Sequence, residues 1–245
     1  MAQTSETQNC GCLFLIPVPL TDFDGLEQLP KMVVETVRAL NHFVVEDAKT
    51  ARRILKEFAH PTPLASIRMA TLNEHTPVAE VASLLQPLST GFDVGLMSEA
   101  GCPAVADPGA QLVRLAHQQG FTVVPMIGPS SILLALMASG LEGQRFAFQG
   151  YLPVDNATRR TRILQLEKRS RVERETQIFI ETPYRNTALL TALLETLNPG
   201  ALLCVALDLT SPRQVIRTAS VAEWRCTSHP PLDRKPAVFL FLAAC

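Results

Sequence analysis

Short apolar runs alternate with amphipathic helical segments along almost the whole of this 245-residue chain. The runs CLFLIPVP, HFVVED, FDVGLM and FTVVPMI have the length of buried strands. Between them lie helical patterns such as AKTARRILKEFA, in which Ala51, Ile54 and Phe58 share one face. Strands separated by helices form largely parallel sheets. The alternation therefore predicts an α/β fold.

A change of composition after Gly150 predicts a second domain. Residues 151–175 are polar and charged, and a new series of strand and helix patterns follows them, including TQIFIE, NTALLTALLETL, LLCVALDL and AVFLFLAA. We therefore expect two α/β domains with mostly parallel sheets, the first over residues 1–150 and a smaller one over residues 151–245.

Two turns rich in glycine and proline, SEAGCP and GPSS, follow predicted strands. Ligands of open α/β sheets bind at the carboxyl ends of strands, where glycine lets the backbone approach a ligand and proline restricts the loop. Neither turn has the spacing of a P-loop or of a dinucleotide-binding motif. From the residues alone, tight turns without a ligand are an equally good interpretation.

The segment from Met97 to Pro153 resembles the tetrapyrrole methylase superfamily. SEAGCP, VADPG, GPSS, MASGL and FQGYLP match the family's central motifs in order and spacing. The branch that it resembles most methylates the ribose 2'-hydroxyl of small-subunit ribosomal RNA. Weaker similarities in VVEDAKTARRILKEF, IFIETPYRN and ALDLT extend the resemblance over most of the chain.

The resemblance implies a homodimer that binds S-adenosyl-L-methionine in a cleft between the two domains. Carried over residue by residue, it assigns the cofactor to Pro19, Ser98, Ala100, Gly101, Cys102, Ser130, Ser131, Ile180, Ala206, Leu207 and Ala237. Cys102 stands where the family has threonine. We interpret it as a cofactor-loop residue, because a nucleophilic cysteine requires a nearby base that the sequence does not show.

Methyl transfer to a hydroxyl requires a group that takes the hydroxyl proton. The candidates near predicted strand ends are Glu46, Asp47, Glu74, His75 and Glu181. Each has a structural alternative: Asp47 precedes a helix that it can cap, Glu74 lies in an ordinary loop pattern, and Glu181 ends a strand where a hydrogen-bonding role is common. The residues alone leave the choice open.

The predicted macromolecular partner is ribosomal RNA or the small ribosomal subunit. The net charge of -1 gives no overall attraction to phosphate, but RRTRILQLEKRSRVER gathers Arg159, Arg160, Arg162, Lys168, Arg169, Arg171 and Arg174. A phosphate-binding surface and a solvated helix face explain this cluster equally well.

Several motifs depart from the family pattern, with PLTD for P-I-G-N, EDAK for E-D-T-R and PYR for P-H-R. Two alternatives therefore stay open. In the first, the chain is a methyltransferase that acts on a tetrapyrrole or another small metabolite. In the second, it is a non-catalytic relative that binds S-adenosyl-L-methionine.

The first ten residues, MAQTSETQNC, lack the pattern of a secretory signal, and the longest uncharged stretch is interrupted by prolines and glycine. We therefore expect a cytoplasmic protein that does not enter a membrane. The six cysteines are scattered and we expect reduced thiols. No histidines stand at zinc spacing, so we expect no metal.

Overall fold

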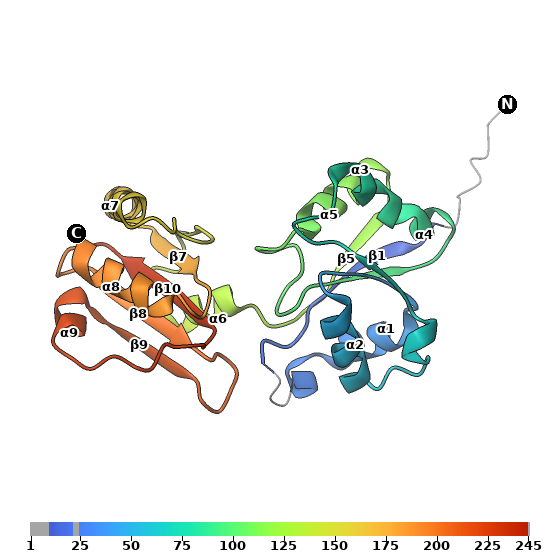
Figure 1. Cartoon of the computed structure of the whole chain (residues 1–245), viewed down its shortest axis with the longest axis horizontal. Helices are drawn as coiled ribbons and strands as arrows, with labels where there is room; N and C mark the ends of the chain where they lie inside the picture. Colours follow the sequence, from blue (N-terminus) through green and yellow to red (C-terminus); the bar gives the residue numbers. More distant parts are fainter. Residues whose placement is uncertain (1–9, 22–24, 245) are drawn as a thin grey trace. The chain divides into compact units, whose positions relative to one another are not determined.

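The computed structural model describes residues 10–21 and 25–244, and the chain divides into two compact units, Met1–Pro129 and Ser130–Cys245 (Figure 1). This division comes earlier than the boundary at residue 150 that the sequence suggested. Helix α6 (Ser131–Ser139) packs on the sheet of the second unit, and β6 (Phe146–Phe148) is a strand of that sheet. The change of composition marks the polar surface of helix α7 (Asn156–Glu173) instead.

The first unit is built on a five-stranded sheet with the order β3-β2-β4-β1-β5. Its strands are β1 (Cys12–Ile16), β2 (His42–Val45), β3 (Arg68–Thr71), β4 (Val94–Met97) and β5 (Thr122–Pro125). Its helices are α1 (Lys31–Ala39), α2 (Ala48–Glu57), α3 (Val78–Val81), α4 (Gln86–Ser89) and α5 (Gly109–Gln118), with 3-10 turns η1 (Gly25–Gln28), η2 (Leu64–Ser66) and η3 (Ala82–Leu85). Every strand pair is parallel, as predicted.

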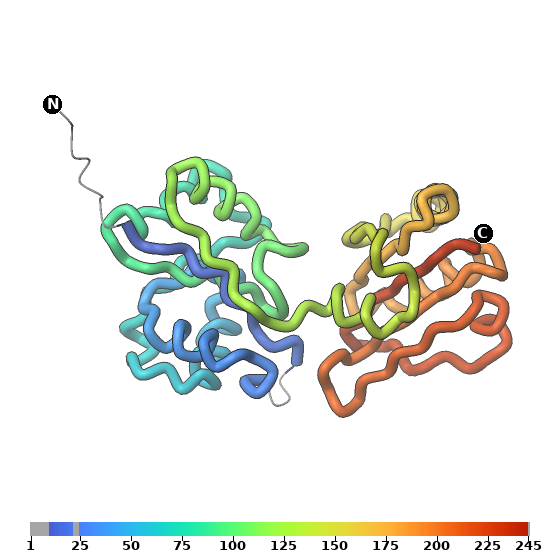
Figure 2. Tube along the Cα trace, turned by 180° about the vertical axis from the view of Figure 1, so that it is seen from behind, coloured from blue at the N-terminus to red at the C-terminus, as the bar shows by residue number. Residues whose placement is uncertain are grey.

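Alternate residues of these strands face two separate cores, because side chains of a strand point to opposite faces. Phe43 and Val45 pack with α1 and α2 on one face, whereas Val44 and Leu96 pack with the α3–α4 segment and α5 on the other. Helices thus cover both faces of the sheet. The loops that follow the strands lie at the carboxyl ends of the strands, where ligands of such sheets bind. Figure 2 shows the helices of this unit on both sides of the strands.

The second unit also has a five-stranded sheet, with the order β6-β7-β10-β8-β9. Its further strands are β7 (Thr176–Ile180), β8 (Leu202–Leu207), β9 (Val215–Ser220) and β10 (Ala237–Leu242), and its further helices are α8 (Asn186–Thr196) and α9 (Val221–Arg225). Only β6 and β7 are parallel, so the expectation of a mostly parallel second sheet was wrong. A short connection turns β8 directly into β9, and such a hairpin is necessarily antiparallel.

The main core of the second unit lies between its sheet and α7, α8 and α9. Trp224 of α9 is fully buried in this core, which also contains Phe239 and Phe241 of the central strand β10, and its indole N–H donates to the Leu203 carbonyl over 2.8 Å. Helix α6 contacts β8, β9 and β10, where Cys204 and Leu240, which are fully buried, belong to the opposite face of the sheet. The unit therefore has its own core.

Within residues 10–21 and 25–244, no helix is long and apolar enough to cross a membrane. The cysteines of this part are Cys10, Cys12, Cys102, Cys204 and Cys226, and all of them are free thiols. Cys245 lies outside the described residues.

Candidate functional site

Two loops lie side by side at the carboxyl edge of the first sheet. Strand β1 leads into the first loop and its neighbour β4 leads into SEAGCP. Val18 and Gly101 exchange two backbone hydrogen bonds of 2.9 and 3.1 Å, which join the two loops. The structure therefore brings the loop that contains Pro19 together with the loop of Ala100, Gly101 and Cys102, and the assignment of these residues to a cofactor stays a prediction. Asp22, the last residue of PLTD, lies outside the described residues.

Gly101 has a backbone conformation that other residues rarely adopt. Its φ is +75°, and a Cβ atom placed on it would lie 3.2 Å from Cδ2 of Leu20. From the sequence, we predicted that this glycine lets the backbone approach a ligand. The structure adds a second reason for glycine, because the left-handed conformation is what lets the loop pair with Val18.

Cys102 is held as a thiol within this loop. Its Sγ donates to the Pro129 carbonyl over 3.4 Å. Burial raises the pKa of the Cys102 thiol, and the nearby negative charge of Asp107 raises it further. Both effects disfavour a thiolate, which supports the interpretation of Cys102 as a loop residue without a nucleophilic role.

Beside SEAGCP, a small cavity of about 10 Å³, with room for about one water molecule and partly open to solvent, is lined by Glu46, Ser98 and Asp107 together with apolar residues. Glu46 follows β2 and Ser98 follows β4, and the last residues of these strands, Val45 and Met97, are paired. Parallel strands thus deliver both side chains to one edge of the sheet. The Ser98 side chain is buried and its hydroxyl donates to the Ala100 carbonyl over 3.3 Å.

Asp107 is the most perturbed acid of this cavity. Burial raises its pKa to about 6, with a contribution from the negative charge of Glu46, while a hydrogen bond with Ser98 opposes the shift. Burial also raises the pKa of Glu46. A carboxyl group that titrates near neutral pH in a cavity is a candidate for proton transfer.

The backbone before Asp107 is strained. Ala104 and Ala106 both have a φ of 65°, in the left-handed region that is uncommon for residues with a Cβ atom. Such conformations persist only where surrounding contacts enforce them, and they cluster at functional sites. Asp107 was not among the predicted acids, although VADPG was one of the matching motifs, because those candidates were taken from the ends of predicted strands and Asp107 lies ten residues after β4.

The other acidic candidates have structural contacts. Asp47 caps α2 by accepting from the Thr50 backbone N–H over 2.7 Å, and this bond lowers its pKa. Glu181 belongs to the second unit, is buried, and has an ion pair of 2.8 Å with Arg185. These contacts favour the structural alternative for both residues.

Glu74 is exposed beside His75, with 3.5 Å between Glu74 Oε1 and His75 Nε2. The carboxylate contributes a weak electrostatic effect at Glu46, whose pKa it helps to raise, but it does not line the cavity. The structure therefore brings Glu46, Ser98 and Asp107 together and leaves Glu74 at the surface.

The remaining predicted cofactor residues belong to the second unit. Val238 of β10 is paired with Ile180 on one side and with Ala206 on the other, and Ala237 is paired with Leu207. These residues lie side by side at one end of the sheet. Ser130 caps α6 by accepting from the Leu133 N–H, and Ser131 is the first residue of that helix. Their role in cofactor binding stays a prediction.

Within the part of the chain that the structure describes, no group of three histidine, cysteine, aspartate or glutamate residues has the arrangement of a metal site.

The fold is that of known methyltransferases. The methyltransferase CobJ aligns with a TM-score of 0.62 and 18% identity over 96% of this chain and 95% of its own. Diphthine synthase aligns with a TM-score of 0.67 and 16% identity over 95% of this chain and 90% of its own. Identities this low establish the architecture only.

Sequence similarity establishes the family. The model of the Tetrapyrrole (Corrin/Porphyrin) Methylases matches residues 23–224, and the chain belongs to this family of methyltransferases. The protein named ribosomal RNA small subunit methyltransferase I from Pseudomonas aeruginosa is 32% identical over 215 residues, 88% of this chain and 72% of its own. The protein of the same name from Vibrio cholerae is 30% identical over 211 residues, 86% of this chain and 69% of its own.

Proposed function

We propose that this protein uses S-adenosyl-L-methionine to methylate a ribose 2'-hydroxyl in small-subunit ribosomal RNA. The observation that carries this proposal is the similarity, over more than four fifths of the chain, to proteins named ribosomal RNA small subunit methyltransferase I. The 2'-hydroxyl is the acceptor in the branch that the SEAGCP and VADPG motifs resemble.

The residues at the carboxyl edge fit such a cofactor. The Thr21 hydroxyl of the first loop is buried and makes no hydrogen bond within the described residues, so it is available to a bound ligand. Ala100, in the adjoining loop, is exposed and small. When bound, the cofactor supplies a methyl group on a positively charged sulfur. We propose that the two loops of the first unit, and the predicted residues of the second unit, hold it for an in-line transfer.

Within this proposal, Asp107 accepts the proton of the acceptor hydroxyl. The residue lines a cavity beside the cofactor loop, and with a pKa of about 6 it is deprotonated at neutral pH yet more basic than an ordinary aspartate. Proton transfer to a positioned group of matched pKa contributes about 100- to 10,000-fold to a rate. The negative charge of Glu46, which follows β2, raises that basicity.

The reaction is tested by incubating the protein with labelled S-adenosyl-L-methionine and undermethylated small ribosomal subunits. Digestion of the RNA to nucleosides and mass spectrometry should reveal a 2'-O-methylated nucleoside. Label found only in a small-molecule extract would replace RNA by a metabolite as acceptor. Cofactor binding without transfer to either fraction would identify a non-catalytic relative.

The cofactor loop is tested by Gly101→Val. We expect a loss of binding in isothermal titration, because a branched side chain disturbs both the left-handed backbone and the pairing with Val18. Gly120→Val is the matched control: Gly120 has a similar φ of +78°, follows the C-cap of α5, and has no atom within 4 Å of an added Cβ. Equal cofactor affinity in the two folded variants would show that the loop is not the cofactor site.

We also propose that the protein is a cytoplasmic homodimer. The cytoplasm contains the proposed substrate, and α6 presents the exposed apolar side chains of Leu133 and Met137. These side chains, exposed by 51% and 79%, stand four positions apart and therefore lie on one face of the helix. Sedimentation at micromolar concentration should show a dimer that Leu133→Glu with Met137→Glu dissociates, and a monomeric parent chain would refute the proposal.

A further inference from the structure

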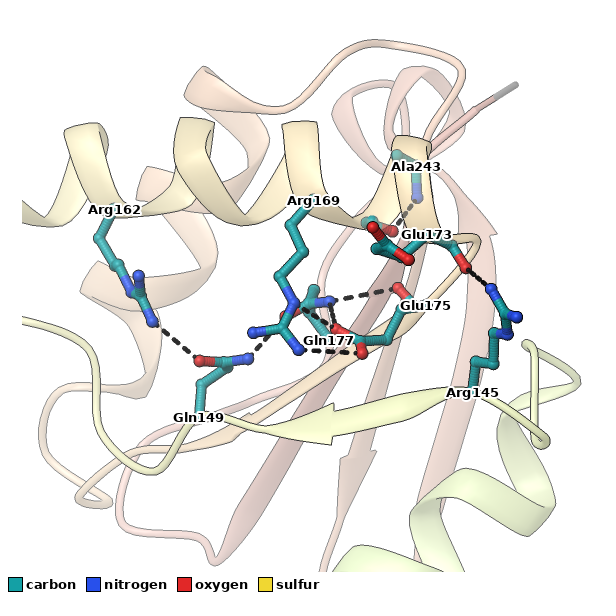
Figure 3. Close-up of polar contacts among 9 residues, drawn as sticks. Arg145, Gln149, Arg162, Arg169, Glu173, Glu175, Gln177 and Ala243 are labelled. Carbon is teal, nitrogen blue, oxygen red and sulfur yellow. Dashed lines mark hydrogen bonds and ion pairs between the residues drawn. The ribbon is translucent and has the colours of Figure 1, made fainter.

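The cationic side chains of α7 fall into two groups that the sequence could not separate. One group is bound within the second unit. Figure 3 shows Arg162 and Arg169 extending from α7 toward the sheet, where Arg162 donates to Gln149, just after β6, over 2.9 Å. Arg159 is buried and donates to the Val154 carbonyl over 3.3 Å and to Asn156, and Arg171 donates to the Ala244 carbonyl over 3.3 Å. All four of these arginines therefore already have hydrogen-bond partners within the second unit.

A continuous polar network under the helix explains this first group. Arg169 contacts both oxygens of Glu175, at 2.8 and 3.0 Å. The buried Gln177 donates to Glu175 over 2.7 Å and accepts from Gln149 over 2.8 Å, and Gln149 in turn accepts from Arg162. The network joins α7 to β7 and to the segment after β6 (Figure 3). It therefore holds the helix in one position on the sheet.

The second group faces solvent. Arg160, Lys168 and Arg174 are exposed, and within the described residues no carboxylate pairs with them. Some exposed cations of the other unit do have such partners: Lys31 pairs with Glu35 on α1, and Arg53 pairs with Glu57 on α2. On α7 the acid nearest in sequence to Lys168 is Glu167, which is buried and accepts from the Asn198 backbone N–H over 2.8 Å. Glu173, the last residue of α7, is exposed but forms no ion pair with these three cations within the described residues.

We infer that the outer face of α7, defined by Arg160 and Lys168, binds the phosphate backbone of the RNA substrate together with Arg174, the residue that ends the helix in a left-handed conformation, an inference that rests on the proposed function. Arg160 and Lys168 are eight positions apart, which places them about 12 Å apart along the helix. The polar network holds the helix in one position, so its unpaired cations are available at fixed places for phosphate groups. Contacts to phosphates orient a nucleic acid without reading its sequence. Leu164 and Val172, exposed by 48% and 69%, interrupt the row with apolar surface.

The test is the triple variant Arg160→Gln, Lys168→Gln, Arg174→Gln, compared with Arg38→Gln, Lys56→Gln, Arg114→Gln. The control removes the same charge from exposed positions on α1, α2 and α5. Binding of undermethylated small subunits and of their protein-free RNA is measured between 50 and 200 mM salt. We expect the α7 variant to bind on the order of tenfold more weakly or worse, with the slope of log affinity against log salt smaller by about 2. The rate at saturating subunits should not change.

The outcomes separate this inference from the proposed function. If the parent protein binds and methylates subunits while the α7 variant behaves like its control, the role of α7 is refuted and the function stands. If the α7 variant loses affinity for subunits but not for protein-free RNA, the partner of this face is a ribosomal protein, and the RNA inference is wrong. If the parent protein neither binds RNA nor methylates subunits, the function fails and the inference fails with it.

Discussion

The two units differ in whether their buried acidic side chains have cationic partners. In the first unit, Glu46 and Asp107 are partly buried around a cavity, and burial raises the pKa of both. In the second unit, the buried acids Glu181 and Asp208 are paired with Arg185 and Lys235 at 2.8 and 3.3 Å. Buried acids without a cationic partner are unfavourable for folding, and their presence at the carboxyl edge of the first sheet supports the proposed proton transfer there.

The arrangement of the strands explains part of this difference. The all-parallel first sheet sends several loops to one edge, where polar groups from distant parts of the chain meet. The mostly antiparallel second sheet returns the chain through a hairpin and covers its main core with α7, α8 and α9. The comparison predicts that changes in the second unit act mainly on stability and changes at the first edge act mainly on activity.

The largest expected effect is that of Trp224→Ala, which should destabilise the second unit by about 3–5 kcal/mol because it empties a fully buried site. Denaturant unfolding followed by circular dichroism should show an earlier transition for this unit. Trp224→Phe keeps most of the volume and loses the bond to Leu203, so its cost should be smaller. Equal stability of Trp224→Ala and the parent chain would contradict the assignment of this core.

The second effect is catalytic. Asp107→Asn should lower the methyl-transfer rate by about 100-fold or more, because the amide cannot accept the hydroxyl proton. The parent rate should rise as the pH passes through about 6, following deprotonation of Asp107, and this limb should vanish in the variant.

Asp93→Asn is the matched control for that experiment. Asp93 accepts from the Cys12 N–H over 2.7 Å at the start of β1, the opposite edge of the same sheet. A pH profile that keeps its limb in Asp107→Asn would assign the proton to another group.

The third expected effect is a gain in stability, in the same Asp107→Asn variant that loses activity. Because the folded state raises the pKa of Asp107 from 3.8 to about 6, its contribution to stability is complete below pH 4 and is lost as the pH rises through 6. Asp107→Asn should therefore stabilise the chain at pH 7.5, by about 1 kcal/mol once the solvent exposure of the carboxylate is discounted, and not at pH 4. Denaturant unfolding at the two pH values measures this. A loss of stability at pH 7.5 would contradict the raised pKa.

The smallest effect is expected for Asp47→Ala. Removing the cap of α2 should reduce thermal stability slightly, since the Thr50 N–H loses its acceptor, while methyl transfer to small subunits continues at the parent rate. Asp47→Asn retains an acceptor and should restore the stability. A strong loss of activity in both variants would return Asp47 to the list of catalytic candidates.

The sequence predicted much of the fold because its apolar periodicity is local. The helix at Ala51 and Ile54 and the strands HFVVED and FDVGLM occur where expected, and the first sheet is parallel. The direction of β10 was not predictable, since an apolar run such as AVFLFLAA fits a parallel or an antiparallel neighbour equally well. Its pairing with β7 and β8 is decided by tertiary contacts.

The site was predicted unevenly for a similar reason. SEAGCP was found from its glycine and proline content, and Gly101 does have a positive φ. Asp107 was missed because its raised pKa depends on burial and on Glu46, which is far away in sequence. Likewise, no spacing rule separates Arg162, bound to Gln149, from the exposed Arg160 on the same helix.

The position of the boundary between Pro129 and Ser130 matters for anyone who wishes to study the second unit as an isolated fragment. A gene cut at residue 151, as composition suggests, would remove α6 and β6 and expose Cys204 and Leu240 to water. Such a fragment would present an uncovered apolar sheet with an open edge at β7, a known route to aggregation. A fragment that begins at Ser130 retains the helix that covers this face, together with the residue that caps it.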